Sequence, residues 1–412
     1  MDLSSGKTFW DTTFSGYSYP ELEENLNCDV LIVGSGSSGA HCAYFLADQG
    51  LKVALIDKRE IAGGSTSSNT GLLQYSNDKM LSALIRTFGE EAAVRHYKLC
   101  LEAIKTLSDT VVPSLAQNSD LVIRKSLYFA SQLEDVDSLK EEYDTLQKYG
   151  FPVEYYTKDM IEKHFSFSKE GAIVTGNDAE INPFKHAHLL IHYAHTKGTL
   201  VFERTKINGR KRTPEGDILY TDKGFAIKAK HIIYATGYEA QEEVRDPNGA
   251  IVSSYALATN PVGDIKGWHD NMMLWETARP YIYARRTVDG RIVFGGLDET
   301  TTKLGKRDSM IIHKRDLLME KIFTMFPELK GKAVAEYYWG AFFGETHDGL
   351  PTIGIYEDYP NSYFLRGYGG NGTVYSIILS QIIRDLIVSG KNEDAYLYLK
   401  ERPVLHPEES AV

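Results

Sequence analysis

A glycine-rich turn between two apolar runs, near the start of the chain, restricts its fold more than any other feature. The run from Asp29 to Val33 leads into the turn Gly34-Ser-Gly-Ser-Ser-Gly39. A helical stretch and a second apolar run follow, and the second run ends at Asp57. Continuous apolar runs of this kind are typical of strands that are buried on both faces of a parallel sheet. The order of strand, glycine turn, helix, strand and acid predicts a Rossmann-like α/β domain.

Each part of this unit has a separate role in binding a dinucleotide. Gly34 permits the tight turn, Gly36 lets a pyrophosphate approach the backbone, and Gly39 lets the helix pack closely on the strand. The helix N-terminus offers free N–H groups to the phosphates. Asp57 lies 18 residues beyond Gly39, and its carboxylate can accept hydrogen bonds from a ribose diol but would repel the 2′-phosphate of NADP. The unit therefore predicts a site for NAD or FAD, with a purely structural glycine turn as the alternative.

A second loop favours FAD over NAD. The segment from Ala62 to Gly71 has no helical or strand periodicity and almost no apolar residues. Such a loop can surround a ligand with backbone N–H and hydroxyl donors. A long flavin dinucleotide that lies across a sheet edge needs a second loop of this kind, whereas the alternative is a flexible linker.

Apolar runs near residues 30, 233 and 364 predict two interleaved domains, because segments of a different character separate them. The second of these runs ends on the small residues Ala235-Thr-Gly237, as close backbone approach requires. Strand-like runs between residues 251 and 296, with a turn at Asp289-Gly290, predict an antiparallel sheet in the other domain. We expect an FAD-binding domain at 27–80, 180–245 and 340–395, a substrate domain at 81–179 and 246–339, a leader at 1–26 anchored by aromatic residues such as Trp10, and a tail at 396–412.

Charge and cysteine content exclude several classes of protein. The 412 residues carry 45 Lys and Arg against 56 Asp and Glu, which gives a net charge of −11. Neither nucleic acid nor an anionic membrane attracts such a chain. Three scattered cysteines do not form a disulfide scaffold or a zinc site and indicate a reducing compartment. The chain shows no signal-peptide pattern and no apolar stretch long enough to span a bilayer, so a cytoplasmic location without membrane insertion is expected.

Taken together, the motifs of this chain resemble those of the D-amino-acid-oxidase-like superfamily of FAD-dependent oxidoreductases, which includes glycine and sarcosine oxidases. The leader around Trp10 is most similar to the γ-glutamylputrescine-oxidase-like bacterial subgroup. Phe88-Gly-Glu-Glu is similar to a segment of a subgroup that carries a Rieske domain, although no Cys-x-His pair follows residue 340. The matching motifs are Gly34-x-Gly-x-x-Gly39 with Asp57, Gly63-Gly-Ser-Thr-Ser-Ser68, Ala235-Thr-Gly237, Gly349-Leu-Pro-x-Ile-Gly354 and Gly369-Gly-Asn-Gly372.

The resemblance implies the residues that bind FAD. The glycine turn would hold the pyrophosphate, Asp57 the ribose, and the backbone of Ile207 the adenine. Members with covalent FAD attach it through Cys or His, and the segment from Tyr338 to Glu345 has neither, so non-covalent FAD is expected. The full set comprises Gly34, Gly36, Ser37, Ser38, Gly39, Asp57, Lys58, Gly64, Ser65, Thr66, Ser67, Ile207, Ala235, Thr236, Gly237, Gly349, Leu350, Gly369, Gly370, Asn371, Gly372 and Thr373, of which the residues from Gly349 onward would border the flavin ring.

The resemblance also implies the reaction, which is oxidation of a C–N bond in an amine or an N-substituted or D-amino acid by hydride transfer to flavin. Oxygen or another electron acceptor would be the partner. Phe343 stands where glycine oxidases carry an arginine that clamps the substrate carboxylate, so larger substrates such as acylated polyamines are favoured. Three alternatives remain open: a dehydrogenase or electron relay that serves an iron–sulfur or quinone acceptor, oxidation of a 2-hydroxy acid, and an NAD-dependent dehydrogenase.

The candidate catalytic residues are Tyr281, Arg285 and Arg366. Tyr281, Tyr283 and Arg285 share one face of a predicted strand because side chains alternate. Aromatic walls with one guanidinium suit a substrate with an anionic group, and the alternative is a solvated row of arginines. Arg366 directly precedes a glycine-rich turn, where it would contact substrate or flavin or else pair with an acid. Glu345 and His347 are weaker candidates for a general base, and a helix face with His188, His192 and His195 is expected to be structural rather than a metal site.

Overall fold

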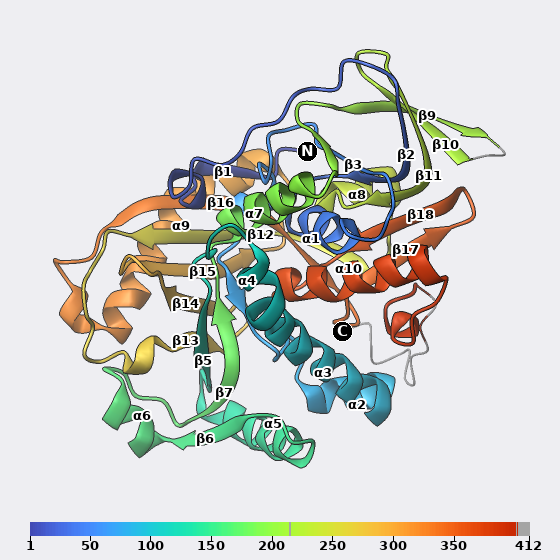
Figure 1. Cartoon of the computed structure of the whole chain (residues 1–412). Helices are drawn as coiled ribbons and strands as arrows, with labels where there is room; N and C mark the ends of the chain where they lie inside the picture. Colours follow the sequence, from blue (N-terminus) through green and yellow to red (C-terminus); the bar gives the residue numbers. More distant parts are fainter. Residues whose placement is uncertain (214–215, 401, 403–412) are drawn as a thin grey trace.

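Two β-sheets organise the protein in a computed structural model that describes residues 1–213, 216–400 and 402 (Figure 1). Within those residues one sheet has eight strands and the other has ten. The chain passes between the sheets several times, so each sheet collects strands from distant parts of the sequence. This arrangement agrees with the predicted class, a Rossmann-like α/β domain joined to a domain built on a mainly antiparallel sheet.

The eight-stranded sheet has a parallel centre in the order β18-β11-β2-β3-β8. The side chains of Val30, Leu31 and Ile32 in β2 are fully buried, as expected for a strand covered on both faces. An antiparallel strand, β17, closes one edge, and a hairpin of β9 and β10 joins β11. The strands are β2 (Leu26–Val33), β3 (Val53–Ile56), β8 (Leu200–Phe202), β9 (Ile207–Thr213), β10 (Gly216–Thr221), β11 (Ala226–Tyr234), β17 (Thr352–Tyr356) and β18 (Tyr359–Arg366).

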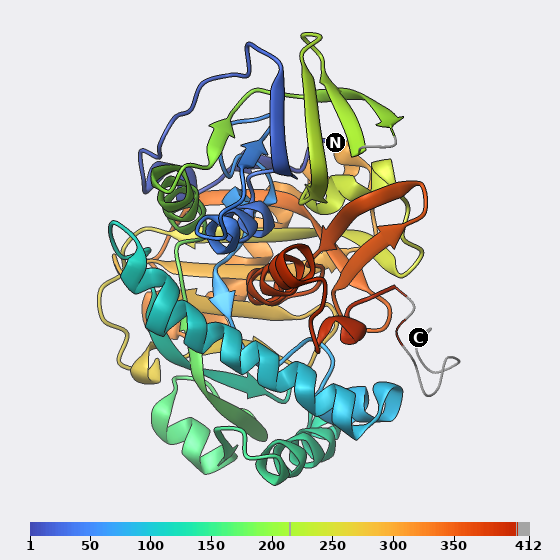
Figure 2. The same cartoon turned by 45° about the vertical axis from the view of Figure 1, so that its right-hand side comes forward.

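Three helices pack beside one another against this sheet. Figure 2 shows α1 (Ser37–Leu46, blue) between α7 (Pro183–Thr196, green) and α10 (Gly372–Ser389, red). The contact of α1 with β2 depends on Gly39, because a Cβ atom there would lie 1.8 Å from the carbonyl oxygen of Gly34. Gly39 thus has the close-packing role that the glycine turn predicts.

The ten-stranded sheet follows the order β1-β16-β12-β15-β14-β13-β5-β7-β4, with β6 paired to β7. Most of its pairs are antiparallel, and β13 with β5 is parallel. Helix α9 (Leu304–Met325) covers one face through a core that includes Leu257, Phe294 and Leu318. The strands are β1 (Ser4–Lys7), β4 (Leu72–Leu73), β5 (Val122–Phe129), β6 (Val153–Thr157), β7 (Gly171–Glu180), β12 (Gly249–Thr259), β13 (Met273–Glu276), β14 (Ile282–Arg286), β15 (Ile292–Glu299) and β16 (Ala335–Thr346).

The remaining helices lie mainly around the β5–β7 edge, where α3 packs on both α10 and β7. They are α2 (Leu81–Phe88), α3 (Glu90–Thr106), α4 (Val112–Ser114), α5 (Val136–Lys148), α6 (Lys158–His164), α8 (Ala240–Glu243) and α9 (Leu304–Met325), with a π-helical turn at Leu107–Val111 and 3-10 turns at Trp10–Thr12, Ser65–Ser68, Leu133–Asp135, Gly237–Glu239, His269–Asn271, Pro327–Leu329 and Ala395–Leu397.

The strand assignments correct three of the predicted domain borders. β4 and the whole of β16 belong to the ten-stranded sheet, although residues 72–73 and 340–346 were expected in the FAD-binding domain. β1, in the predicted leader, pairs with β16 in the same sheet. The physical reason is that β16 pairs with β12 along nearly its whole length, and this continuous ladder extends past the expected border. Phe9 and Trp10 anchor the leader, as expected, by packing against Trp339 and Val293.

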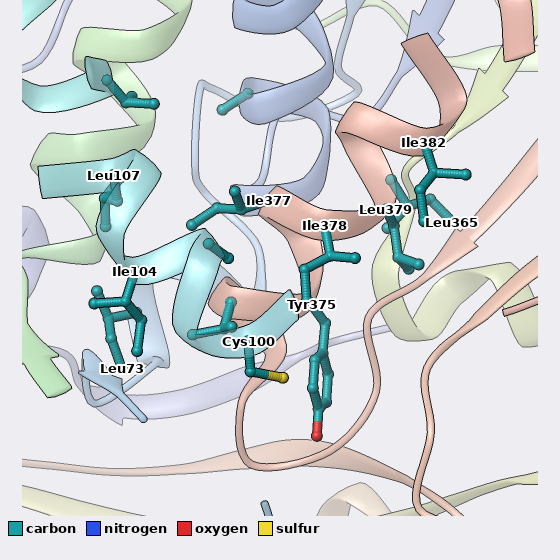
Figure 3. Close-up of a cluster of buried hydrophobic side chains, with 14 of the residues drawn as sticks. Leu73, Cys100, Ile104, Leu107, Leu365, Tyr375, Ile377, Ile378, Leu379 and Ile382 are labelled. Carbon is teal, nitrogen blue, oxygen red and sulfur yellow. The ribbon is translucent and has the colours of Figure 1, made fainter. Parts of the chain in front are cut away.

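Helix α10 is the one helix in the described parts of the chain that is long and apolar enough to cross a membrane, with a mean hydropathy of 1.2. More than half of it, 56%, is buried inside the protein. Figure 3 shows its residues Ile377, Ile378 and Leu379 within a cluster of buried side chains that also includes Ile104 and Leu365. These contacts are those of a core helix.

Candidate active site

A cavity of about 590 Å³ is lined by residues from both sheets. One part of its wall comes from the turns that follow β2, β3 and β11, from the loop at residues 64–70, and from the N-terminus of α10. We call this part the dinucleotide cradle. Its members include Gly34, Gly36, Ser37, Ser38, Asp57, Lys58, Gly64, Ser65, Thr66, Ile207, Ala235, Thr236, Gly237, Gly369, Gly370, Asn371, Gly372 and Thr373. The cradle thus unites most of the residues that the resemblance implies for FAD.

The glycine turn is fixed by neighbours on both sides. Gly34 has a φ of +107°, and a Cβ atom there would lie 2.5 Å from the carbonyl oxygen of Ala235. The hydroxyl of Thr66 accepts a hydrogen bond from the Ser37 N–H at 2.9 Å, which ties the second loop to the first turn of α1. This bond joins the glycine turn to the second loop, although Ser37 and Thr66 are 29 residues apart in the sequence.

Three buried hydroxyl groups of the cradle have no partner within the described structure. They are Ser37 Oγ, Ser65 Oγ and Thr373 Oγ1. A buried polar group without a partner is costly, so these groups indicate a ligand rich in hydrogen-bonding atoms. Ser37 and Thr373 also lie in the first turns of α1 and α10, where free N–H groups favour an anion. The residues present therefore fit a dinucleotide such as FAD.

Asp57 closes the cradle at the end of β3. Its carboxylate accepts hydrogen bonds from the Ser35 N–H at 2.7 Å, the Ser35 hydroxyl at 2.6 Å and the Arg59 N–H at 2.8 Å. Burial raises the pKa of Asp57, and these three hydrogen bonds oppose the rise. A carboxylate oxygen can accept a second bond, so the group remains able to receive a ribose hydroxyl.

Lys58 and Arg59 are both paired with one acid from the turn that follows β11. Glu239 accepts from Lys58 at 2.8 Å and from Arg59 at 3.0 Å. Burial alone would raise the pKa of Glu239, but the hydrogen bonds from Arg59 and Lys58 lower it to about 2. This cluster of charged groups holds the turns after β3 and β11 together. The side chains of Lys58 and Arg59 pair with Glu239 in it.

Four predicted cofactor residues do not line the cavity. They are Gly39, Ser67, Gly349 and Leu350. Ser67 donates its hydroxyl to the Gly64 carbonyl at 2.8 Å, which shapes the second loop from within. Leu350 is a core residue, and Gly349 faces the side chain of Lys79. Gly349 and Leu350 therefore do not have the place at the cavity wall that was expected of residues bordering the flavin.

Three long-range donors hold consecutive carbonyl groups of the second loop. The indole N–H of Trp339 donates to Ser68 O at 3.0 Å, that of Trp10 donates to Asn69 O at 2.6 Å, and Arg285 Nε donates to Thr70 O at 2.7 Å. All three acceptor residues line the cavity, whereas Trp10 and Arg285 do not. Trp10 and Arg285 therefore hold the loop from outside the cavity, whereas Trp339 also lines the cavity, and together the three donors fix the path of the loop backbone.

This role replaces the predicted contact of Arg285 with substrate. Arg285 is only 2% exposed, donates to Ile181 O at 2.7 Å, and lies 3.6 Å from a carboxylate oxygen of Glu180. The predicted alternation is correct in that Tyr281 and Tyr283 line the cavity. The strand continues beyond the cavity edge, however, and the ring of Trp10 covers the guanidinium there at 4.9 Å. The assignment of Arg285 to the substrate is therefore wrong.

Arg366 is also placed away from the cavity. Its side chain is fully buried and donates to Tyr356 Oη at 2.6 Å and to Val244 O at 2.7 Å. Asp246 lies 3.5 Å away as an ionic partner. The alternative interpretation, an arginine that pairs with an acid, is the one that the geometry supports.

The second part of the cavity wall comes from the ten-stranded sheet and from the segment after β4. We call it the substrate wall, and aromatic rings dominate it. Its members are Gln74, Ser76, Asn77, Asp78, Ser254, Tyr255, Ala256, Trp275, Tyr281, Tyr283, Trp339, Ala341, Phe342 and Phe343. Of these, Tyr281, Tyr283 and Phe343 were singled out from the sequence toward the substrate, and the others, among them the residues from Gln74 to Asp78, were missed. The one local signal was a run of polar residues directly after the apolar pair of β4.

Asp78 connects the substrate wall to the cradle. Its carboxylate accepts from the Gly370 N–H at 2.7 Å and from the Tyr281 hydroxyl at 3.4 Å. Burial raises the pKa of Tyr281 far above 10, and the negative charge of Asp78 adds to the rise. Tyr281 is therefore a neutral phenol at physiological pH and serves as a hydrogen-bond donor.

The weaker candidates lie outside the cavity lining. Burial raises the pKa of Glu345, and repulsion by Asp78 adds to it, but the side chain does not line the cavity. His347 is exposed. Among the three helix histidines, His188 accepts from the Tyr17 N–H at 3.2 Å and His192 stacks on Tyr17 at 3.8 Å. The described residues contain no group of three His, Cys, Asp or Glu that could hold a metal.

Comparison with known proteins identifies relatives along almost the whole chain. Residues 29–386 match the family model described as DAO, FAD dependent oxidoreductase. The chain is 24% identical over 412 residues to a Bacillus subtilis protein whose name marks it as a proposed Rieske 2Fe-2S iron–sulfur protein, with 97% of this chain and 76% of that protein covered. It is 23% identical over 397 residues to the gamma-glutamylputrescine oxidoreductase of Escherichia coli, with 93% and 89% covered.

Solved structures show the same fold. Glycine oxidase from Geobacillus kaustophilus superimposes with a TM-score of 0.73 at 19% identity, over 89% of this chain and 96% of the other. L-proline dehydrogenase from P. horikoshii superimposes with a TM-score of 0.72 at 18% identity, over 92% and 97%. At these identities the match establishes the architecture of two interleaved sheets.

Proposed function

Because the chain belongs to the DAO family of FAD-dependent oxidoreductases, we propose that it oxidises a C–N bond of an amine or an amino acid. The protein is an oxidoreductase, and FAD is its cofactor. The observation that carries the reaction is one continuous cavity that joins the dinucleotide cradle to the substrate wall. A small molecule bound against that wall shares the cavity with the cofactor.

The residues of the cradle would hold FAD through backbone and hydroxyl donors. Ser37 and Ser65 offer unpaired hydroxyl groups beside the N-terminus of α1, where negative charge is stabilised. Thr373 offers a third at the N-terminus of α10. When bound, the flavin ring supplies the acceptor for the electrons that leave the substrate.

The substrate wall would position the amine and exclude water. Its rings present an apolar surface to the substrate. The Tyr281 hydroxyl and the Asp78 carboxylate are the polar groups on this surface that would fix the orientation of the amine. Correct placement of reacting groups can contribute roughly 7–11 kcal/mol to a reaction of this kind. We therefore assign most of the contribution of this chain to orientation rather than to a strong base.

The cofactor would be bound without a covalent link. The described residues that line the cavity include no Cys and no His, the two residue types that attach FAD in covalent relatives. Purified protein should be yellow, and acid precipitation should release the flavin into the supernatant. Flavin that remains with the pellet would refute non-covalent binding.

The reaction is tested by reduction of the bound flavin without oxygen. Amines, α-amino acids of both configurations, N-methylated amino acids and 2-hydroxy acids are added in parallel, and flavin absorbance near 450 nm is followed. An amine or an amino acid should bleach the flavin. Bleaching by 2-hydroxy acids alone would overturn the C–N assignment.

A second candidate concerns the electron acceptor. The name of the Bacillus subtilis relative includes a 2Fe-2S centre, which favours a dehydrogenase that passes electrons to an iron–sulfur or quinone acceptor. Admission of air after reduction of the flavin distinguishes an oxidase from a dehydrogenase. Re-oxidation within seconds, with one peroxide per flavin, supports an oxidase. Slow re-oxidation in air but fast re-oxidation by a quinone or a one-electron acceptor supports the dehydrogenase.

A further inference from the structure

The substrate wall carries negative charge and lacks positive charge. Charged residues line the cavity at several places, but all except Asp78 come from the turn after β3, from the turn and helix α8 after β11, and from β9 and its preceding residue, which lie on the cradle side. Among the described residues of the substrate wall, Asp78 is the single acidic side chain, and none is Lys, Arg or His. A substrate carboxylate would therefore meet no cation on this wall.

Two further acids strengthen the negative potential behind the wall. Burial raises the pKa of Asp298 to about 6, and the charges of Glu345 and Asp78 add to the rise. One oxygen of Asp298 is buried without a hydrogen-bond partner. Glu345 experiences the same repulsion from Asp78. Carboxylates that repel each other in a partly buried place favour the arrival of a cation.

The nearby cationic side chains donate hydrogen bonds to backbone carbonyl groups. Arg279 Nη1 donates to the carbonyls of Glu276, Thr277 and Ala278, at 3.4, 3.3 and 3.0 Å, and Nη2 donates to Asp78 O at 3.1 Å. Lys79 Nζ donates to His347 O at 2.7 Å, and Lys314 Nζ donates to Leu297 O at 2.8 Å. Arg279 keeps its positive charge and lies over the Tyr281 ring, 4.9 Å from the ring centroid. Arg279, Lys79 and Lys314 do not line the cavity, so none of them stands where an arginine in place of Phe343 would meet a substrate carboxylate.

Two neutral donors in the wall point to the rest of the ligand. The carboxamide nitrogen of Gln74 and the indole N–H of Trp275 are buried and have no partner in the described structure. Both residues are more than nine-tenths buried, with 8% and 5% of their surfaces exposed. Each calls for an acceptor atom on a ligand. Two neutral donors do not balance a full carboxylate charge beside Asp78, so a hydroxyl or an amide carbonyl suits them better.

On these grounds we infer that the substrate is an amine cation that carries no carboxylate on its reacting carbon, with Asp78 as its counter-ion. Arg279 already covers one face of the Tyr281 ring at 4.9 Å and Tyr128 stacks on Trp275 at 3.7 Å, so the other aromatic rings of the wall would supply cation–π attraction. Gln74 and Trp275 hold a neutral acceptor on the same molecule. This assignment rests on the proposed C–N oxidation and narrows it from amines and amino acids to amines.

Matched pairs of ligands test the inference on the FAD-loaded protein. 1,4-Diaminobutane is compared with ornithine, and 1,5-diaminopentane with lysine, because each pair differs only in the carboxylate. The flavin is first reduced with dithionite and oxygen is excluded, so the bound flavin cannot accept electrons, and dissociation constants are then measured by isothermal titration calorimetry free of any turnover. The diamine of each pair should bind at least tenfold more tightly. Equal or tighter binding of the amino acids overturns the inference while leaving C–N oxidation intact.

A charge-neutral variant tests the role of Asp78. Asp78→Asn keeps an oxygen that can accept from the Gly370 N–H, and it should weaken 1,4-diaminobutane at least tenfold. Asp270→Asn removes an exposed charge outside the cavity lining and serves as the control. A change of less than twofold in Asp78→Asn refutes the counter-ion. If Asp78→Asn does not retain FAD, the comparison of the diamines with the amino acids on the unmodified protein still tests the inference. Reduction of the flavin by 2-hydroxy acids alone would instead refute the proposed function.

Discussion

At the scale of single residues, Gly36 and Gly39 of the glycine turn have different roles. A Cβ atom on Gly36 would meet only the end of the Thr66 side chain, at 2.9 Å, whereas one on Gly39 would collide with backbone at 1.8 Å. We predict that Gly36→Val folds but does not retain FAD, because the added methyl groups occupy the place of the ligand. Gly39→Val should instead lose the fold. Circular dichroism and flavin content separate the two outcomes, and loss of folding in both variants would contradict the assignment.

The buried histidine pair between α1 and α7 predicts how stability depends on pH. His41 is fully buried, with Nδ1 2.8 Å from Ser37 O and Nε2 3.3 Å from His186 Nε2. Burial lowers the pKa of His41 to about 4 and lowers that of His186 well below 6.5. The unfolded chain therefore binds more protons between pH 6.5 and 4, so the free energy of unfolding falls as the pH drops through that window, by on the order of 3 kcal/mol for His41.

Urea unfolding of the FAD-loaded protein at pH 7.5 and at pH 5 measures this dependence. The variant His41→Gln cannot titrate in that range, so its free energy of unfolding should fall less between the two pH values than that of the unmodified protein. An identical fall in both proteins would show that other groups cause the pH dependence.

At the scale of elements, the second loop depends on three donors that are distant in the sequence. Removal of the guanidinium in Arg285→Met releases Thr70 O and Ile181 O and leaves Glu180 with Arg124 as its remaining ionic partner, at 3.0 Å. We predict a loss of about 3 kcal/mol in the free energy of unfolding and weaker retention of FAD. The affinities for anionic and cationic ligands should change by the same factor, because Arg285 does not line the cavity.

Trp10→Phe is the matched milder change in that loop. It removes the indole donor to Asn69 O but keeps an aromatic ring in the cluster with Phe9 and Trp339. A loss of about 1 kcal/mol in the free energy of unfolding is expected, with FAD dissociating faster than from the unmodified protein.

For Arg285→Met, a selective loss of affinity for anionic ligands, with FAD retention unchanged, would restore Arg285 to the substrate site.

At the scale of the whole molecule, the N-terminal segment completes the cavity. β1 pairs with β16, the Phe342 N–H donates to Leu3 O at 2.9 Å, and Leu3 lines the cavity. We predict that deletion of residues 2–8 lowers the FAD content of the purified protein and promotes aggregation, because it exposes the edge of β16. Flavin content and light scattering measure the two effects, and full FAD content in the shortened protein would contradict this role.

The sequence by itself determined the parts of the protein that are local. The unit from Asp29 to Asp57 is contiguous, and its contacts, such as those of Gly39 with Gly34 and of Asp57 with Ser35, join residues of the same short stretch of chain. Short-range sterics and the glycine requirement are therefore enough to indicate the Rossmann-like domain and the place of the dinucleotide. The interleaving of two sheets followed from the spacing of similar apolar runs, although the borders at β1, β4 and β16 did not.

Only the tertiary structure decided what faces the substrate. The alternation of Tyr281, Tyr283 and Arg285 was correct, but where the cavity ends along that strand depends on Trp10, which lies in the leader. Asp78 meets its partner Gly370 across 292 residues, and Trp339 reaches Ser68 across 271. No local pattern encodes such pairs, because they exist only when both sheets are packed. The charge of the substrate wall is therefore a property of the assembled fold.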